Sequence, residues 1–421
     1  FIITMKIFVT LVLLFLSFPS SVFSQKIAGP WNGVLEVNPL TSITLVFNIS
    51  VSEDGETCTI DSPDQGAYGI SAIINYLSDD YVNISIPKVD ATYTGKKKDG
   101  KIFGTFTQKG IPFTLNLISG TVVYKRPQTP KPPYPYATED VMFCNKKDDV
   151  ELSGTLTLPF AANKKKVPVV LLVTGSGQQN RDEELFAHKP FLVIADYLAR
   201  NGIASLRYDD RGIGKSTGNM KGCTTADFMN DADAGLNFLR QSKRFKKVGV
   251  VGHSEGGMIA FMLGARGLTD FVVALAAPGL KGDSVLAEQN CSALKSAGIN
   301  KNVTSHDIQA YIEQQGDSNR WLRFFADYDP KHDLSLTRCP VMALYGSLDK
   351  QVLPASNLSA VSDFLPKNKY NVTKKYAGLN HLFQHSKTGM PDEYSKIEET
   401  FSIEVLADMT AWIKNVSDCN Q

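Results

Sequence analysis

Five prolines fall within eleven positions of the chain, residues 126–136, and no other segment constrains the fold as strongly. Proline fixes φ at about −65° and has no backbone N–H, so neither a helix nor the interior of a sheet can run through such a segment. We therefore expect a stiff, extended linker at these positions. The chain has 421 residues, which is enough for one domain on each side of that linker.

Residues 25–125 have the pattern of many short strands. Apolar and polar residues alternate over residues 31–37 and 43–49, which is the period-two pattern of a strand with one buried face. Turn-forming pairs follow at fairly even spacing: Asp54-Gly55, Asp79-Asp80, Asp99-Gly100 and Lys109-Gly110. These features predict a small antiparallel β barrel or sandwich.

The pattern changes over residues 137–421, where apolar strand segments alternate with helical segments. We expect strands at Val150–Leu158, Val167–Val173, 203–208, 248–252, 271–276, 340–345 and 371–376, and helices at 185–199, at Thr225–Gln241 and from Gly256 onward. This alternation predicts an α/β fold, with a mostly parallel sheet covered by helices on both faces. Residues 281–336 interrupt it with polar helical stretches. We expect them to form a small cap over the carboxyl ends of the strands, where the active sites of such sheets lie.

The N-terminus has the pattern of a signal peptide. Lys6 supplies a positive charge, residues 7–18 are almost entirely apolar, and Val22 and Ser24 occupy the positions that a signal peptidase reads. We expect cleavage after Ser24, which would remove residues 1–24 and leave a secreted or periplasmic protein. No other apolar run has the length of a transmembrane helix, so we expect no stable membrane insertion.

Charge and cysteine content exclude several other classes. The formal net charge is +1, hydrophobic residues make up 43% and charged residues 21%, which is typical of a globular protein without strong attraction to nucleic acid or anionic lipid. There is no C-x-x-C pair, so no metal cluster is expected, and no other pattern calls for a cofactor. The composition leaves the oligomeric state open. We expect mostly buried free thiols at the six cysteines, Cys58, Cys144, Cys223, Cys291, Cys339 and Cys419.

The sequence G-H-S-E-G at residues 252–256 fits the G-x-S-x-G pattern of a nucleophile elbow. Gly252 and Gly256 remove the Cβ clashes that would prevent the tight turn from strand to helix. Chance produces so short a pattern often, and a second copy has Ser216 at its centre, in a glycine-rich loop with no strand directly before it. An apolar strand precedes Ser254 and a helix follows it, so we assign Ser254 as the nucleophile.

A serine hydroxyl needs a base, and the base needs an acid to orient it. With a nucleophile elbow the chain order is nucleophile, acid, histidine. His381 follows the last expected strand and is the expected base, while His385, one helical turn further on, is the competing candidate. Asp349 follows the preceding strand and is the expected orienting acid; Asp333 and Asp363 are more poorly placed.

Two backbone N–H groups are expected to stabilise the oxyanion of a tetrahedral intermediate. One belongs to Glu255, directly after the nucleophile. The other is expected in the small-residue loop 174–178, where we choose Ser176 and leave Gly177 as the alternative. Charged segments 180–183 and 207–212 lie at the same edge of the sheet. We expect ion pairs that hold the loops there, with binding of a polar substrate group as the alternative.

These motifs together resemble bacterial α/β-hydrolases of the serine-aminopeptidase-like class, and more closely its exported two-domain carboxylesterases with an N-terminal β-domain. The resemblance implies hydrolysis of short acyl esters through Ser254, Asp349 and His381, without a cofactor. Thr174 departs from the pattern, since many relatives of the broader fold have histidine there, and the cap segment is short beside related chains. The resemblance rests on residues 31–35, 61–67, 174–177, 211–218, 252–257, 346–349, 379–384 and 391–401.

Two other functions remain open at this point. A peptidase that acts on N-terminal residues would need acidic groups near its pocket to hold the free α-amine. A catalytically vestigial hydrolase would leave the β-domain as a binding module for carbohydrate or a partner. In the favoured interpretation the partner is a small-molecule ester.

Overall fold

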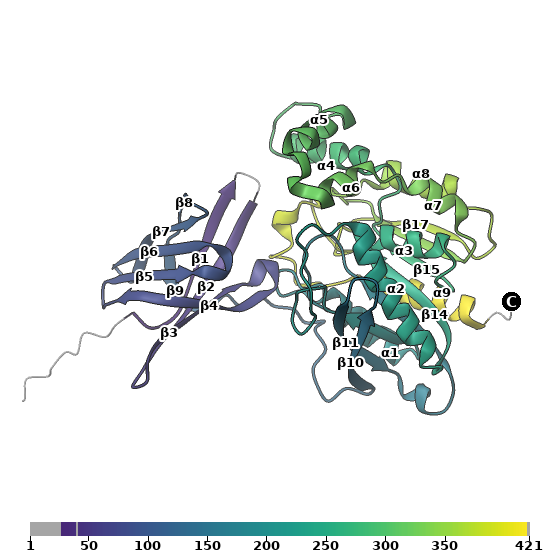
Figure 1. The fold of residues 1–421 in the computed structure, drawn as a ribbon, viewed down its shortest axis with the longest axis horizontal. Coiled ribbons are helices and arrows are strands. Elements are labelled where there is room, and N and C mark those ends of the chain that lie inside the picture. The colour runs from purple at the N-terminus through teal and green to yellow at the C-terminus, as the bar shows by residue number, and fades with distance from the viewer. Residues whose placement is uncertain (1–26, 39–40, 419–421) are drawn as a thin grey trace, which may run out of the picture.

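The computed structural model describes residues 27–38 and 41–418. Within them the chain forms two sheets, one in an N-terminal β-domain and one in a larger α/β domain (Figure 1). The expected signal peptide and Cys419 lie outside the described residues.

The β-domain is antiparallel, as predicted, and of the two expected forms it is the barrel. The strands pair in the order β6-β5-β4-β3-β2-β1-β9-β7-β8, and a further pairing of β6 with β7 closes the ring. The strands are β1 (Gly29–Asn38), β2 (Thr41–Ser52), β3 (Gly55–Ser62), β4 (Ala67–Leu77), β5 (Tyr81–Ile86), β6 (Ala91–Lys98), β7 (Lys101–Gln108), β8 (Ile111–Thr114) and β9 (Leu117–Ser119).

Alternation and turn chemistry explain why these residues form a barrel. In β5 every second side chain is buried, so that Val82, Ile84 and Ile86 point into the barrel core. Asp99 and Gly100 form the two-residue turn between β6 and β7 with positive φ values of 51° and 75°. Such a turn matches the right-handed twist of the two strands that it joins.

The α/β domain contains an eight-stranded sheet in the order β10-β11-β13-β12-β14-β15-β16-β17. The β10–β11 and β11–β13 pairs are antiparallel and the rest of the sheet is parallel, which confirms the expected class. The strands are β10 (Ala137–Asn145), β11 (Val150–Leu158), β12 (Val167–Val173), β13 (Ala204–Tyr208), β14 (Phe245–His253), β15 (Val272–Leu275), β16 (Val341–Gly346) and β17 (Val372–Tyr376).

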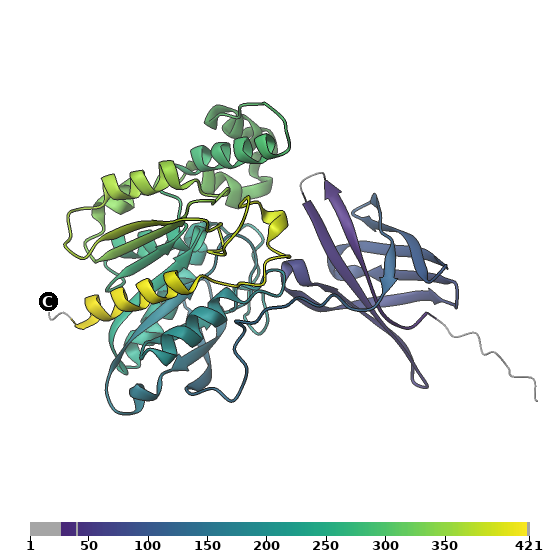
Figure 2. The same ribbon diagram turned by 180° about the vertical axis from the view of Figure 1, so that it is seen from behind.

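Helices cover both faces of this sheet because its central strands are apolar on both sides. In β12, Val169 and Leu171 belong to the core on one face, while Val170 and Leu172 belong to the core on the other. The first core includes side chains of α2 (Thr225–Gln241) and α3 (Glu255–Ala265), with α8 (Pro354–Phe364) beside them; the second includes α1 (Pro190–Arg200) and α9 (Ile403–Asp418). Figure 2 shows α9, in yellow, lying beside α1 on that second face.

Two features of the α/β domain differ from the sequence expectation. The edge strand β10 was not anticipated, because charged residues such as Glu139 and Asp140 interrupt its apolar pattern. The helix expected from residue 185 begins only at Pro190. Residues before it form a loop in which Glu183 and Phe186 have positive φ values of 52° and 51°, and proline then starts the helix at its first position.

The segment expected to form the cap contains four helices in sequence, α4 (Gly282–Ser296), α5 (Ser305–Gln315), α6 (Arg320–Asp327) and α7 (Pro330–Leu336). The first three group together at one end of the domain (Figure 1). In contrast, α7 packs against α3, and its Leu334 is part of the sheet core. The cap therefore consists of α4 to α6, while α7 belongs to the helical layer.

The proline-rich segment is fastened to the α/β domain. The Gln128 side chain donates to the carbonyl of Phe401 (2.8 Å) and accepts from the N–H groups of Thr400 and Phe401 (2.5 and 2.9 Å). Arg126 donates to three carbonyl groups of the same domain, those of Phe186, Ser395 and Ile397. Hydrogen bonds from Arg126 and Gln128 therefore attach this segment to the α/β domain.

The cysteines are distributed differently from the expectation. The described cysteines are free thiols, but only Cys58 is buried; Cys144 is exposed, and Cys223, Cys291 and Cys339 are intermediate. The expectation of mostly buried thiols was therefore wrong. Cys144 is exposed because it alternates with the buried Phe143 on the edge strand β10.

Two further features are absent from residues 27–38 and 41–418. This part of the chain contains no helix whose length and hydropathy would allow it to cross a bilayer. It also contains no group of three or more His, Cys, Asp or Glu side chains that could hold a metal ion.

Candidate active site

Ser254 lies on a strained turn between β14 and α3. Its φ and ψ angles are 54° and −117°, a conformation that non-glycine residues rarely adopt. The turn requires its two glycines because a Cβ on Gly252 would lie 2.0 Å from the carbonyl oxygen of Gly256, and a Cβ on Gly256 would lie 2.1 Å from that of Val173. The Ser254 N–H donates to the carbonyl of Leu275 (2.8 Å), which holds the turn against β15.

His381 and Asp349 form a buried pair. The Nδ1 atom of His381 lies 2.8 Å from Oδ2 of Asp349, and the other carboxylate oxygen accepts the N–H groups of Gln351 and Val352 (2.8 and 2.9 Å). Because the carboxylate accepts at Nδ1, that nitrogen carries the proton and Nε2 is left as the basic nitrogen. This is the tautomer that a general base for a serine hydroxyl requires.

The loop that carries His381 is held by its own side chains. Asn380 accepts the N–H groups of Leu382 and Gln384 (3.0 and 2.9 Å). A Cβ on Gly346 would lie 2.3 Å from the carbonyl oxygen of Leu379, so glycine allows the Asp349 loop and the His381 loop to approach each other closely. The two loops meet because β16 and β17 are neighbouring parallel strands.

The competing candidates occupy other positions. The side chain of His385 is 66% exposed and pairs with Glu399 at 2.8 Å. Asp333 accepts the hydroxyl of Tyr328 (2.6 Å), and Asp363 is exposed. Ser216, the serine of the second G-x-S-x-G copy, is buried: it donates to the carbonyl of Asp209 (2.8 Å) and accepts the N–H of Ser153 (2.9 Å).

The expected oxyanion loop lies beside the nucleophile, since a Cβ on Gly175 would be 3.3 Å from Cβ of Ser254. The N–H of Gly175 is taken by Glu183 (2.8 Å), and the N–H of Gln179 by Asp210 (2.9 Å). Among the described residues, no hydrogen bond within the chain uses the N–H of Ser176, Gly177 or Glu255. These groups are therefore all available to a ligand.

The Glu255 side chain has a role that the sequence did not indicate. Its Oε1 atom accepts the hydroxyl of Thr225 in α2 (2.6 Å) and the indole N–H of Trp321 in the cap helix α6 (2.9 Å). Burial raises the pKa of this carboxyl, against the opposing effect of hydrogen bonds from Thr225, Trp321 and Ser176. The residue after the nucleophile thus joins the elbow, the oxyanion loop and the cap.

A second acid, the half-buried Asp210, supports the oxyanion loop through two hydrogen bonds. It accepts the hydroxyl of Thr174 (3.0 Å) as well as the N–H of Gln179. Burial of the carboxyl raises its pKa to about 8, although these two hydrogen bonds oppose the rise. No pattern in the sequence marked Asp210 as different from Asp209 beside it.

The charged segments form ion pairs, as expected, with one another and with Asp231 of α2. Arg181 donates to Asp209 (2.6 Å), Arg207 pairs with Asp182, and Arg211 donates to both oxygens of Asp231 (2.7 Å each). These contacts fasten the loops to the sheet edge.

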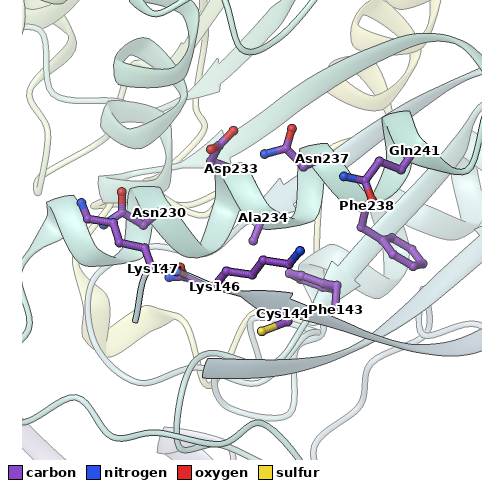
Figure 3. A pocket seen from close by; sticks show the side chains of 11 residues that line it. Phe143, Cys144, Lys146, Lys147, Asn230, Asp233, Ala234, Asn237, Phe238 and Gln241 are labelled. Atoms are coloured by element: carbon purple, nitrogen blue, oxygen red, sulfur yellow. The ribbon is translucent and has the colours of Figure 1, made fainter. Parts of the chain in front are cut away.

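A pocket of about 380 Å³ lies elsewhere, between β10 and α2 (Figure 3). Its lining includes Cys144, Lys146, Asp233 and Asn237 but none of the residues around Ser254. We therefore do not associate this pocket with the catalytic groups.

A mostly parallel sheet with a serine on a strained elbow, and a histidine–aspartate pair on the loops that follow the next strands, defines the α/β-hydrolase fold. Residues 189–323 match the family model described as serine aminopeptidase, S33. The chain is also similar to a curated relative, Esterase EstD of Thermotoga maritima, with 25% identity over 256 residues, which are 58% of this chain and 61% of that protein. The resemblance to hydrolases of the serine-aminopeptidase-like class is confirmed.

Similar solved structures include two esterases. The Pyrococcus furiosus esterase Pf2001 is 16% identical with a TM-score of 0.45, and the match covers 70% of this chain and 98% of that one. Est1E from Butyrivibrio proteoclasticus with bound ferulic acid is 17% identical with a TM-score of 0.45, over 65% of this chain and 97% of that one.

Proposed function

We propose that this protein is a serine hydrolase that cleaves carboxylic esters through an acyl-enzyme on Ser254. The observation that carries the proposal is the buried Asp349–His381 pair beside the strained elbow of Ser254. Asp349 lies on the loop after β16, and His381 lies on the loop after β17. The similarity to a protein named as an esterase supports the same reaction.

The reaction follows from these groups. The hydroxyl oxygen of Ser254 attacks the ester carbonyl carbon while Nε2 of His381 takes the hydroxyl proton. The N–H groups of Glu255 and Ser176 stabilise the oxyanion. When the tetrahedral intermediate collapses, the alcohol leaves with the proton from His381. A water molecule then gives a proton to His381 and attacks the acyl-enzyme carbonyl carbon. When this second intermediate collapses, the acid leaves and His381 returns the proton to the Ser254 oxygen.

Ester hydrolysis is favoured over aminopeptidase activity by the state of the nearby carboxyl groups. Glu183, Asp210 and Glu255 are the acidic side chains around the oxyanion loop, and each already accepts hydrogen bonds from protein donors. These carboxyl groups hold the loops of the site, and a neutral acyl ester needs no carboxylate partner. The chemistry of this site therefore supports neutral acyl esters as substrates.

We further propose a preference for short acyl chains. Trp321 of the cap is bonded to Glu255 next to the nucleophile, and behind it the side chains of Met258, Met262 and Phe325 form a packed apolar cluster. A long acyl chain would have to displace these side chains. Turnover of p-nitrophenyl esters from acetate to dodecanoate should therefore fall steeply with chain length.

Ser254→Ala tests the nucleophile, with Ser216→Ala as the matched control because it alters the other copy of the same motif. We expect Ser254→Ala to abolish hydrolysis of p-nitrophenyl acetate and labelling by a fluorophosphonate probe, while Ser216→Ala remains labelled. Retained activity in Ser254→Ala would overturn the proposal. A wild-type protein that resists the probe would favour the vestigial alternative, and faster cleavage of aminoacyl anilides than of esters would favour the peptidase.

We also propose that the protein is exported after removal of residues 1–24. The basis is the charged, apolar and small-residue pattern of those residues. Mass spectrometry of the protein from its native host should give Gln25 as the first residue, and an uncleaved N-terminus would contradict export by this route.

A further inference from the structure

A second histidine–carboxylate pair lies beside the catalytic groups. His253 is the residue before Ser254, and its Nδ1 atom lies 2.9 Å from Oε1 of Glu183. Its Nε2 atom lies 3.0 Å from the carbonyl oxygen of His381, and the ring centroids of His253 and His381 are 4.8 Å apart. Both His253 and Glu183 are buried.

Glu183 reaches a third element as well. The same Oε1 atom accepts the N–H of Gly175 in the oxyanion loop (2.8 Å). The pair therefore makes one hydrogen bond to the oxyanion loop, through Glu183, and one to the loop of His381, through His253. His253 is also part of the elbow, since it directly precedes Ser254. Glu183 holds this position with a φ of 52°, and backbone strain of this kind persists only where the surroundings maintain it.

The partners determine how many protons this pair carries. A carbonyl oxygen can only accept, so Nε2 of His253 must carry a proton to bond His381. Oε1 of Glu183 already accepts the N–H of Gly175, so Nδ1 must carry a proton as well if the carboxylate is to accept from both. The three hydrogen bonds are satisfied together when His253 is an imidazolium and Glu183 a carboxylate.

We propose that Glu183 and His253 are positioning residues. A doubly protonated His253, paired with Glu183, fixes the relative positions of the oxyanion loop, the elbow and the His381 loop. This inference rests on the proposed function, because the relative positions of these loops affect catalysis only if Ser254, His381 and the oxyanion loop act together. It goes beyond the Ser254–His381–Asp349 triad, since neither residue contacts the reacting atoms.

The charges around His253 are consistent with this protonation state. Burial by itself lowers the pKa of His253, but the Glu183 carboxylate, the His381 carbonyl and the Asp349 carboxylate outweigh it, so the pKa lies above the ordinary value of 6.5. The other titratable groups facing the pair are the ring of His381 and, on the Glu183 side, Asp210.

Glu183→Gln separates this role from general structural support. The glutamine oxygen can still accept two N–H groups, but the amide has no charge to favour the imidazolium. A neutral His253 has one proton for two acceptors, so one of the three hydrogen bonds is lost for either tautomer and either orientation of the amide. At low pH His253 becomes protonated again and all three can form.

We therefore expect kcat for p-nitrophenyl acetate to fall about tenfold in Glu183→Gln at pH 8, as for the loss of one buried hydrogen bond, with little change in KM. The ratio of mutant to wild-type kcat should then recover severalfold as the pH falls to about 6. Using the ratio cancels any effect of pH that is common to both proteins. Glu399→Gln is the matched control, because it makes the same change in the exposed His385–Glu399 pair, and its ratio should stay near one at every pH.

A ratio for Glu183→Gln that does not change with pH would overturn the inference, even if the thermal stability falls. If Ser254→Ala retained activity, the proposed function itself would fail, so the two failures are distinguishable. A second measurement does not depend on folding of Glu183→Gln: ¹⁵N NMR of histidine-labelled wild-type protein at pH 7.5. Both ring nitrogens of His253, assigned by their loss in His253→Gln, should appear protonated, and a neutral ring would overturn the inference.

Discussion

Gly256→Ala tests whether backbone contact at the elbow, rather than glycine flexibility, positions the catalytic groups. The new Cβ would lie 2.1 Å from the carbonyl oxygen of Val173 and 2.5 Å from that of Thr174. Non-bonded atoms are at their optimum at about 3.5 Å or more, so the start of α3 and the oxyanion loop must separate by about 1 Å. Both contacts are backbone atoms, which cannot rotate away as a side chain can.

The expected effects on stability and on activity differ in size. Overpacking costs about 1–3 kcal/mol, while alanine is favoured over glycine in a helix by about 1 kcal/mol. The free energy of unfolding should therefore fall by no more than about 2 kcal/mol. A displacement of about 1 Å between reacting groups costs about 100-fold in rate, so kcat should fall by roughly that factor.

The assay compares Gly256→Ala with Gly264→Ala, which lies in the same helix. A Cβ on Gly264 would meet side-chain atoms of Thr337 and Val272 at 3.1 and 3.3 Å, and these can move aside. Urea unfolding gives the stability and p-nitrophenyl acetate hydrolysis gives kcat. We expect Gly264→Ala to keep wild-type kcat. Wild-type kcat in Gly256→Ala, or an equal loss of kcat in both variants, would refute the reasoning.

Three further predictions concern other parts of the structure. Asp349→Asn should lower kcat by about 10⁴-fold, because His381 then loses the acceptor that fixes its tautomer, whereas His385→Ala should keep wild-type activity; equal losses would contradict the assignment. Asp210→Asn should stabilise the protein relative to the wild type, by an amount that grows between pH 4 and pH 8. The Asp210 carboxyl of the unfolded chain ionises above its ordinary pKa of 3.8, but in the folded protein its pKa is about 8. The stability of the wild type therefore falls as the pH rises through that window. Urea unfolding at pH 5, 7 and 9 would show the trend, and a difference independent of pH would count against it. Gln128→Ala leaves the N–H groups of Thr400 and Phe401 without their acceptor, so the free energy of unfolding should fall by about 1–3 kcal/mol. Limited proteolysis between residues 120 and 136 should become faster. An unchanged cleavage rate would show that the attachment of this segment does not depend on Gln128.

Local sequence was sufficient wherever neighbours along the chain decide the structure. The helix Thr225–Gln241 was predicted with its observed bounds, and the structure shows that the Thr224 and Asp227 side chains form a capping box at its start. The strand Val167–Val173 was predicted because a continuous apolar run suits a strand that is covered on both faces. The edge strand β10 was missed because an edge strand needs no such pattern and tolerates charge.

The sequence by itself therefore determined the class of fold, the antiparallel β-domain, and the short set of residues from which a catalytic site could be built. Only the tertiary structure decided which histidine meets Asp349, why Ser216 is a structural residue, and that Glu183 and His253 connect three loops. The physical reason is distance along the chain. Glu183 and His253 are separated by 70 residues, and His253 and His381 by 128, so their hydrogen bonds exist only after the sheet has brought its strand ends together.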